Sequence, residues 1–411
     1  MNGKLLTKPQ LSILMANSLI HFDTALYGYL VPIIAPLFFP KSQPVVQLIW
    51  GYSPFITSFV AKPFGLLFFS KMAENRREMM VLRYTLLGIG ISLIIMGCLP
   101  TYQEGSFWNI ALLLLARICA EACAAGEDNI AKVYLLKGVV TQQAKKLAAW
   151  YEASTMVGIL AAGAVGSCLA WAQLPYWRLP FLIAALATLC NVIVFRLGFV
   201  RSLLNATKIK QTCHPTPSLY LQLWKARQPI MRIAIVAGFG YVAYTIPFLF
   251  FNSFIPMVTS ISYSTMMQYL PILMVFDILL IGWIAKIGRK YDHNNLMAVA
   301  SGLVALSIMP LFAGLQGASI FYVTAVRGWL IFLGVVFSCF LTIWAKEQVA
   351  ATTPYMTIGF ATVLGSSFFG KSATAICLYL FHSFNSPIAP ACYIALLAFG
   401  ATLIMADSAS A

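Results

Sequence analysis

The stretch RICAEACAAGEDNIAK at residues 117–132 follows the apolar run ALLLLA at residues 111–116. Its charged residues are Arg117, Glu121, Glu127, Asp128 and Lys132. A charged side chain at the centre of a membrane helix costs about 2.5 to 3.5 kcal/mol on insertion scales, and such residues usually mark a substrate or ion pathway. The stretch therefore predicts a membrane helix that carries a buried polar site.

The composition supports a membrane protein. Of the 411 residues, 60% are hydrophobic and 9% are charged, whereas soluble domains carry about 25% charged residues. So few polar residues cannot cover a water-facing surface, and we expect an all-α polytopic membrane protein. The formal net charge of +15 comes from bases in short loops between apolar runs. This distribution indicates orientation signals and no nucleic-acid partner.

The residue types that bind metals or perform catalysis form no cluster in the sequence. The nine cysteines stand singly, mostly inside apolar runs, without the Cys-x-x-Cys or Cys/His spacing of a zinc site. The sequence also lacks a nucleophile–base motif and a phosphate-binding glycine loop. We therefore expect no metal, no cofactor and no enzyme activity.

Apolar runs long enough to cross a bilayer recur along the chain. The twelve expected spans are residues 11–39, 45–70, 79–100, 108–135, 147–173, 179–200, 229–256, 264–285, 295–316, 319–345, 355–381 and 388–406. The first run is too long for a signal peptide and is expected to remain as a helix. Transporters built from two halves show such a division into six and six spans. We expect an N-terminal bundle at 1–200, a cytoplasmic linker at 201–228 and a C-terminal bundle at 229–411.

Basic residues orient these spans, because they follow the even-numbered ones. The opposite loops offer little beyond Lys41 and Arg178. The bases on the first side are Lys71, Arg76 and Arg77 after the second span, Lys137, Lys145 and Lys146 after the fourth, Lys286, Arg289 and Lys290 after the eighth, and Lys346 after the tenth. By the positive-inside rule we expect both termini in the cytoplasm.

Five strings occur in an order that resembles a known family. They are HFDTALYGYLVPIIAPLFFP (21–40), AKPFGLLFF (61–69), LPTY (99–102), AAGEDN (124–129) and YWRLPFL (176–182). Together they resemble the metabolite–proton symporter branch of the major facilitator superfamily, which includes proline/betaine, α-ketoglutarate, citrate and shikimate importers. The resemblance covers nearly the whole chain. It implies twelve transmembrane helices in two six-helix bundles, with the substrate between them, and a monomer in a bacterial inner membrane.

The loop motifs of that family are only partly present. The loop after the second span reads AENRR at residues 73–77, with an altered acid and no glycines, and the loop after the eighth keeps its bases but lacks the acid. In the superfamily these loops act as conformational latches. The resemblance therefore implies gating roles for Glu74, Arg76, Arg77, Arg289 and Lys290. Their erosion also leaves open an exporter or a uniporter that has lost tight coupling.

Helical geometry groups the charges of the fourth span. Arg117, Glu121 and Asp128 fall within about 40° of one another around a helix, and Arg117 and Glu121 are close enough to pair at i and i+4. Glu127 lies about 80° round the helix and matches the family's glutamate after glycine. We interpret Arg117, Glu121 and Glu127 as pathway residues. For Asp128 we favour a structural role near the cytoplasmic end.

Asp23 lies in the middle of the first span, with Lys8 and Lys41 far off toward its two ends. No residue nearby in the sequence can pair with it, so we expect it to face the bundle interior. An unpaired buried carboxylate favours its protonated form, which predicts that Asp23 carries the coupling proton. The resemblance adds Tyr27 to the pathway, because Tyr27 belongs to the same helix-1 motif.

The second half of the chain adds three polar residues within apolar spans. Asp277 and Lys371 are candidates for a charge pair between two helices and for the substrate pathway. Arg327 has two interpretations, a place in the pathway or a place at a helix end.

The sequence thus predicts a secondary transporter whose partners are a small polar metabolite, a proton and the lipid bilayer. An osmolyte such as proline or betaine and an organic acid fit equally well. The resemblance favours import, with an exporter or uniporter as the alternative. A membrane sensor that binds without transporting is less favoured, because DSASA (407–411) is short for a signalling domain.

Overall fold

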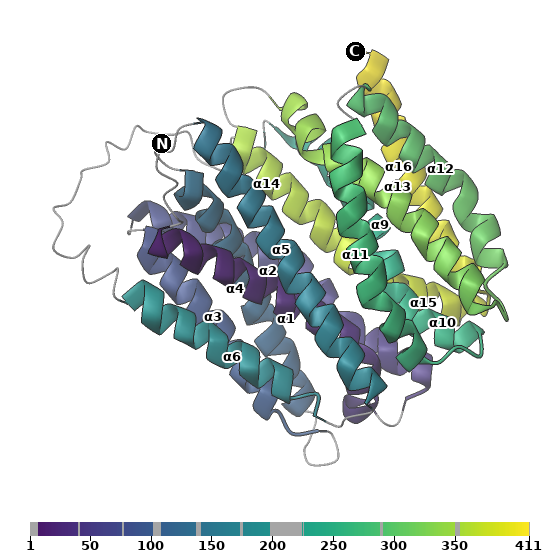
Figure 1. The fold of residues 1–411 in the computed structure, drawn as a ribbon, viewed down its shortest axis with the longest axis horizontal. Coiled ribbons are helices and arrows are strands. Elements are labelled where there is room, and N and C mark those ends of the chain that lie inside the picture. The colour runs from purple at the N-terminus through teal and green to yellow at the C-terminus, as the bar shows by residue number, and fades with distance from the viewer. Residues whose placement is uncertain are drawn as a thin grey trace. The chain divides into compact units, whose positions relative to one another are not determined.

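The computed structural model describes residues 7–39, 42–75, 78–101, 108–136, 141–172, 176–197, 224, 226–287, 291–349 and 354–410. Their secondary structure is helical, and no strand occurs among them (Figure 1). Eleven of the described helices are long and apolar enough to cross a membrane, and a shorter apolar helix lies at Leu179–Val194. The predicted all-α fold with twelve helices is confirmed, and the shorter helix corresponds to the sixth expected span.

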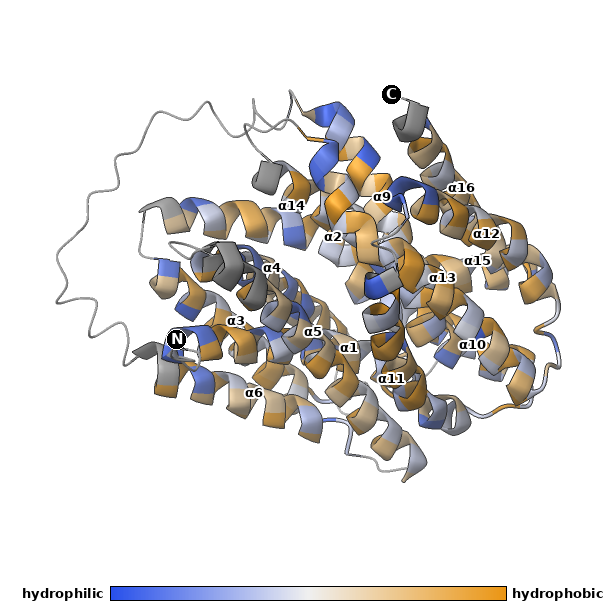
Figure 2. Cartoon of the chain, turned by 45° about the horizontal axis from the view of Figure 1, so that its top comes forward, coloured by the Kyte–Doolittle hydropathy of each residue, from blue (hydrophilic) through white to orange (hydrophobic). Residues whose placement is uncertain are grey.

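The helices follow the apolar runs of the sequence. Those of the first half are α1 (Lys8–Phe38), α2 (Pro44–Asn75), α3 (Glu78–Cys98), α4 (Trp108–Leu136), α5 (Thr141–Trp171), α6 (Leu179–Asn191) and η1 (Val192–Leu197). Those of the second half are α9 (Arg227–Thr245), η2 (Ile246–Phe250), α10 (Phe251–Val258), α11 (Tyr263–Ile287), α12 (His293–Ala313), α13 (Ile320–Glu347), α14 (Pro354–Gly365), η4 (Ser366–Lys371), α15 (Ala373–Phe384) and α16 (Ala389–Ser410). Figure 2 shows mostly hydrophobic residues along α12, α13 and α16.

The chain divides into two compact units that interleave in sequence. Unit 1 contains Met1–Leu30, Val60–Leu169 and Leu174–Thr216. Unit 2 contains Val31–Phe59, Ala170–Gln173 and Pro217–Ala411. The bundle boundaries expected from the sequence stay a prediction.

In unit 1, α1 and α5 meet at backbone distance. A Cβ atom at Gly158 would overlap the carbonyl oxygen of Ser18, so only glycine lets the two helices approach this closely. Beside this contact the Asn17 side-chain amide donates to the backbone oxygen of Tyr151 at 3.0 Å and to the hydroxyl of Ser154 at 2.8 Å. Small residues and interhelical hydrogen bonds stabilise helix pairs in lipid, where no water competes for these groups.

In unit 2, side chains bind the carbonyls of two π-helical segments. Arg327 on α13 donates from Nε to the carbonyl oxygen of Pro247 in η2 at 2.9 Å. Tyr393 on α16 donates from its hydroxyl to the carbonyl oxygen of Phe369 in η4 at 2.9 Å. Backbone groups inside a membrane need partners within the protein, and π-helical segments disturb the regular helical pattern. These two side chains supply partners at such places.

The contact at Gly158 allows a test of the packing. Glycine-to-alanine changes inside helices normally stabilise by about 0.5–1 kcal/mol, because alanine has the higher helix propensity. At Gly158 we expect the opposite sign, a lower melting temperature in detergent, since the new methyl group must push α1 and α5 apart. Gly282→Ala on α11 is the matched control, because no atom lies within 4 Å of its added Cβ. An equal or higher melting temperature for Gly158→Ala would contradict the close contact.

Candidate functional site

A buried ion pair joins the first and fourth helices of unit 1. Nη1 of Arg117 on α4 donates to Oδ1 of Asp23 on α1 at 2.8 Å and to Oδ2 at 2.9 Å. Arg117 is 1% exposed and Asp23 is 3% exposed. The expectation that Asp23 has no charge partner is therefore wrong. No neighbour in sequence pairs with it, but helix packing brings an arginine from 94 positions away.

Two further charged side chains and the aromatic ring of Tyr27 lie near the ion pair of Arg117 and Asp23. Nη2 of Arg117 lies 3.7 Å from Oε1 of Glu121, so the predicted i, i+4 ion pair is present, although the shorter contacts go to Asp23. Nζ of Lys62 on α2 lies 3.8 Å from the other oxygen of Glu121. The guanidinium carbon of Arg117 lies 4.6 Å from the centre of the Tyr27 ring. Two bases and two acids thus balance formally, which lowers the cost of placing each charge away from water.

Glu127 belongs to a separate contact on the same helix. The hydroxyl of Thr85 on α3 donates to Oε2 of Glu127 at 2.6 Å, and both residues are buried. Glu127 follows Arg117 by ten positions, roughly 15 Å along the helix axis. The structure therefore holds two acidic positions at different depths of α4, at Glu121 and at Glu127.

Asp128 links α4 to α5. The Tyr151 hydroxyl donates to Oδ1 of Asp128 at 2.7 Å, and Nζ of Lys132 donates to Oδ2 at 3.0 Å. The Asp128 side chain is 39% exposed, unlike the buried carboxylates of Asp23 and Glu121. These contacts fit the structural role that we favour for Asp128.

Arg327 lies inside the second half and not at a helix end. It is 1% exposed and stands about two turns into α13. Beyond its bond to the Pro247 carbonyl, its Nη2 donates to Oδ1 of Asn252 on α10 at 3.1 Å. The helix-end interpretation is therefore wrong, because the guanidinium connects α13 to η2 and α10.

Asp277 and Lys371 do not form the expected charge pair with each other. Nζ of Lys371, at the end of η4, lies 5.5 Å from the centre of the Phe55 ring. Among the ion pairs of the described residues, none joins Lys371 to Asp277. Asp277 is 5% exposed and lies on α11.

The predicted gating residues lie mostly outside the described part of the chain. Arg76, Arg77, Arg289 and Lys290 fall outside it, and of Glu74 only the backbone, within α2, is described. Their gating roles remain predictions. In the described parts of the chain, no group of three or more His, Cys, Asp or Glu could hold a metal ion.

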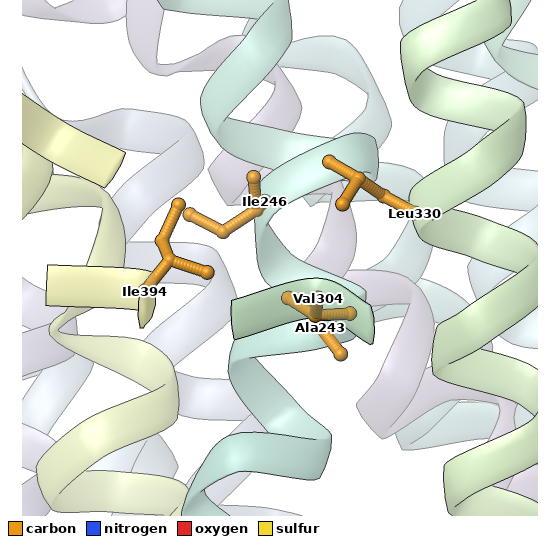
Figure 3. A pocket seen from close by; sticks show the side chains of 5 residues that line it. All are labelled: Ala243, Ile246, Val304, Leu330 and Ile394. Carbon is orange, nitrogen blue, oxygen red and sulfur yellow. The ribbon is translucent and has the colours of Figure 1, made fainter. Parts of the chain in front are cut away.

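An apolar cavity in unit 2 is too small for a metabolite. It measures about 10 Å³ and is lined by Ala243, Ile246, Val304, Leu330 and Ile394 (Figure 3). A cavity needs roughly 10–15 Å³ on this measure to hold one water molecule, and the water needs polar partners. The cavity is therefore a packing void beside η2.

The sequence also contained signals that the prediction missed. Lys62 is a single charge within the second apolar span, as Asp23 is within the first. A charged residue in such a span is expected to face the bundle interior, so Lys62 was also a candidate for the site. Thr85 and Asn252 carried no such signal, because uncharged polar residues are common in apolar helices. Only the packing of α3 and α10 shows what they contact.

Comparison with known proteins identifies the family. Residues 13–370 match the Major Facilitator Superfamily. The chain belongs to the Major Facilitator Superfamily. The chain is a multi-pass membrane protein, and its relatives and structural neighbours are transporters.

Curated relatives support the predicted symporter branch. The chain is 27% identical over 180 residues to a glycine betaine/proline/ectoine/pipecolic acid transporter of Dickeya dadantii (strain 3937). That match covers 41% of this chain and only 35%, about a third, of the relative's own length. The chain is 24% identical over 401 residues to an alpha-ketoglutarate permease of Escherichia coli (strain K12), which covers 93% of this chain and 89% of the permease.

A solved structure confirms the fold. The crystal structure of a D-xylose-proton symporter superposes on this superfamily member with a TM-score of 0.74 at 11% sequence identity. The superposition covers 97% of this chain and 96% of the symporter. At that identity the likeness shows the fold and leaves the substrate open.

The Arg117 contacts predict strong energetic coupling. Arg117→Ala leaves two acids buried without their shared partner, which should lower the free energy of unfolding by about 3 to 5 kcal/mol. Combining it with Asp23→Asn removes one of those acids. The double variant should therefore lose less stability than the sum of the two single losses. Denaturation in detergent gives the free energy of unfolding of the two single variants and of the double variant.

The partly exposed pair of Lys132 and Asp128 provides the control for this cycle. Because solvent screens such a pair, Lys132→Ala should cost at most about 1 kcal/mol. Strictly additive losses for Asp23 and Arg117 would show that the two residues do not interact in the folded protein.

Proposed function

We propose that the chain imports a small metabolite that carries a carboxylate, together with a proton, and that the pair of Asp23 and Arg117 couples the two. The observation that carries this proposal is the burial of the pair inside unit 1. Charged side chains inside a membrane protein cost free energy to bury, and they usually have a function.

The two sides of the pair suggest how coupling works. A proton on Asp23 removes its charge and weakens both bonds from Nη1 of Arg117, so protonation releases the guanidinium. Arg117 already has a spare donor, because its Nη2 is buried and makes no hydrogen bond among the described residues. A guanidinium is suited to carboxylates, since its planar donors match the two oxygens. Proton uptake by Asp23 and substrate binding by Arg117 would therefore favour each other.

The names of the relatives point to the same substrate chemistry. Betaine, proline, ectoine and pipecolic acid, named for one relative, and α-ketoglutarate, named for another, all contain a carboxylate. An osmolyte and an organic acid share this group and differ in the rest of the molecule. Arg117 would recognise the shared group in either case.

Direction and membrane are part of the proposal. The bases that follow the even-numbered spans support a cytoplasmic position for both termini by the positive-inside rule. The bacterial origin of the relatives supports an inner membrane. We propose a monomer that imports, with an exporter or a uniporter as the alternative that the eroded loops leave open.

The coupling role of Asp23 predicts a separation of exchange from accumulation. Asp23→Asn mimics the protonated side chain in shape and charge, and it leaves Glu121 as an acid beside Arg117. The variant should fold and exchange substrate across the membrane. It should concentrate substrate less steeply than the wild type when a proton gradient is imposed, because Asp23 no longer takes up a proton. Both rates are measured in the same proteoliposomes with labelled proline, betaine, citrate and α-ketoglutarate, each in turn.

Asp128→Asn serves as the matched control. It also removes a carboxylate from unit 1, but one that is partly exposed and binds Tyr151 and Lys132. We expect it to retain gradient-driven accumulation. If Asp23→Asn concentrates substrate as steeply as the wild type, the proton travels elsewhere and Glu127 becomes the candidate. Exchange without accumulation in the wild type would instead indicate a uniporter.

A further inference from the structure

A second carboxylate is buried in unit 2, far along the chain from the Asp23 site. Asp277 stands near the middle of α11, between Tyr263 and Ile287, and is 5% exposed. It shares the packed face of α11 with Leu270, Leu273 and Met274, which are also buried, whereas Val275 and Phe276 beside it are exposed. The carboxylate of Asp277 therefore lies on the same buried face of α11 as the apolar side chains that pack this helix within unit 2.

No charged partner offsets Asp277 among the described residues. It makes no hydrogen bond and no ion pair with any of them. α11 packs against α13 and α10. At its start, roughly 20 Å from Asp277 along the axis, Ser264 also donates to the carbonyl oxygen of Ala170 on α5. From α13 the thiol of Cys339 interacts electrostatically with Asp277, and α10, with the sequence FNSFIPMV, carries no titratable residue.

The charged groups of these helices lie well away from Asp277 and Cys339 along the helix axes. On α13, Lys346 and Glu347 follow Cys339 by at least seven positions, roughly 10 Å along the axis, and Arg327 precedes it by roughly 18 Å. On α11 itself, Lys286 lies roughly 13 Å away and the hydroxyl-bearing Tyr269 roughly 12 Å away. Of the titratable groups on these helices, the one that interacts with Asp277 is therefore the thiol of Cys339.

This environment suits a proton better than a metal cation. Sites for hard cations need several oxygen ligands, and the surroundings of Asp277 offer thiol, thioether and aliphatic groups. A proton needs a single oxygen. An ionised carboxylate without a partner bears the full cost of desolvation, and binding a proton removes that cost.

We propose that Asp277 is a second proton-binding site, in unit 2, which takes up and releases a proton during the transport cycle. Its role in transport rests on the proposed proton coupling, but its titration does not. The chain would then carry one exchangeable proton in each unit, one on Asp23 beside Arg117 and the other on Asp277 in an apolar helix face.

Infrared difference spectroscopy of the purified chain tests the titration directly. Between alkaline and acidic buffer, the wild type should gain a carbonyl band of a protonated carboxyl group that Asp277→Asn lacks. Asp277→Glu should shift this band, which keeps the test valid if the asparagine variant does not fold. Asp292→Asn is the control, because Asp292 is a partly exposed acid that caps α12 and asparagine caps equally well.

Accumulation in proteoliposomes tests the role in transport. Each coupled proton permits about tenfold accumulation per unit of pH gradient, so loss of one proton lowers the limit about tenfold per unit. Asp277→Asn should show this loss and keep exchange. A difference spectrum that Asp277→Asn leaves unchanged, or accumulation as steep as in the wild type, overturns the proposal. If the wild type does not accumulate substrate at all, the proposed coupling fails and the spectra still decide whether Asp277 titrates.

Discussion

Burying a charge inside a membrane requires a partner, and the bond from Arg117 to Asp23 meets that requirement at the centre of unit 1. Both carboxylate oxygens of Asp23 accept from one nitrogen of Arg117, at 2.8 and 2.9 Å. Glu121 and Lys62 extend the pair to four charges of balanced sign. Such a cluster is stable only while its members stay together, because removal of one member strands another. Protonation of Asp23 removes one negative charge from the cluster and therefore changes the balance of charge around Arg117, Glu121 and Lys62.

Other polar groups in the two units find partners by the same means, on neighbouring helices. Gly158 brings α5 against the backbone of α1, and Asn17 bonds across that contact. In unit 2, Arg327 and Tyr393 bind carbonyls of the two π-helical segments. Each contact connects different helices, since few polar groups in an apolar helix find partners nearby in their own sequence. Asp277 makes no such contact among the described residues, and for that reason we propose that it binds a proton.

Hydropathy and charge spacing were enough to predict the spans and the burial of the charges. Long apolar runs leave few alternatives to membrane helices, and an acid in the middle of such a run must face inward. The local ion pair of Arg117 and Glu121 followed from helical spacing, because both residues lie on one helix. Contacts between different helices could not be predicted from hydropathy and charge spacing. Asp23 and Arg117 lie 94 positions apart, and nothing in the residue types distinguishes this pairing from the one expected of Asp277 and Lys371, which does not form.

The central claim is that substrate and proton move together through the site at Asp23. The direct measurement is the internal pH of proteoliposomes, without an imposed gradient, while proline, betaine, citrate or α-ketoglutarate enters down its own concentration gradient. The account predicts that the interior acidifies with whichever compound is transported, at a rate that follows substrate entry. Entry of the compound without a pH change, or with alkalinisation of the interior, would contradict it.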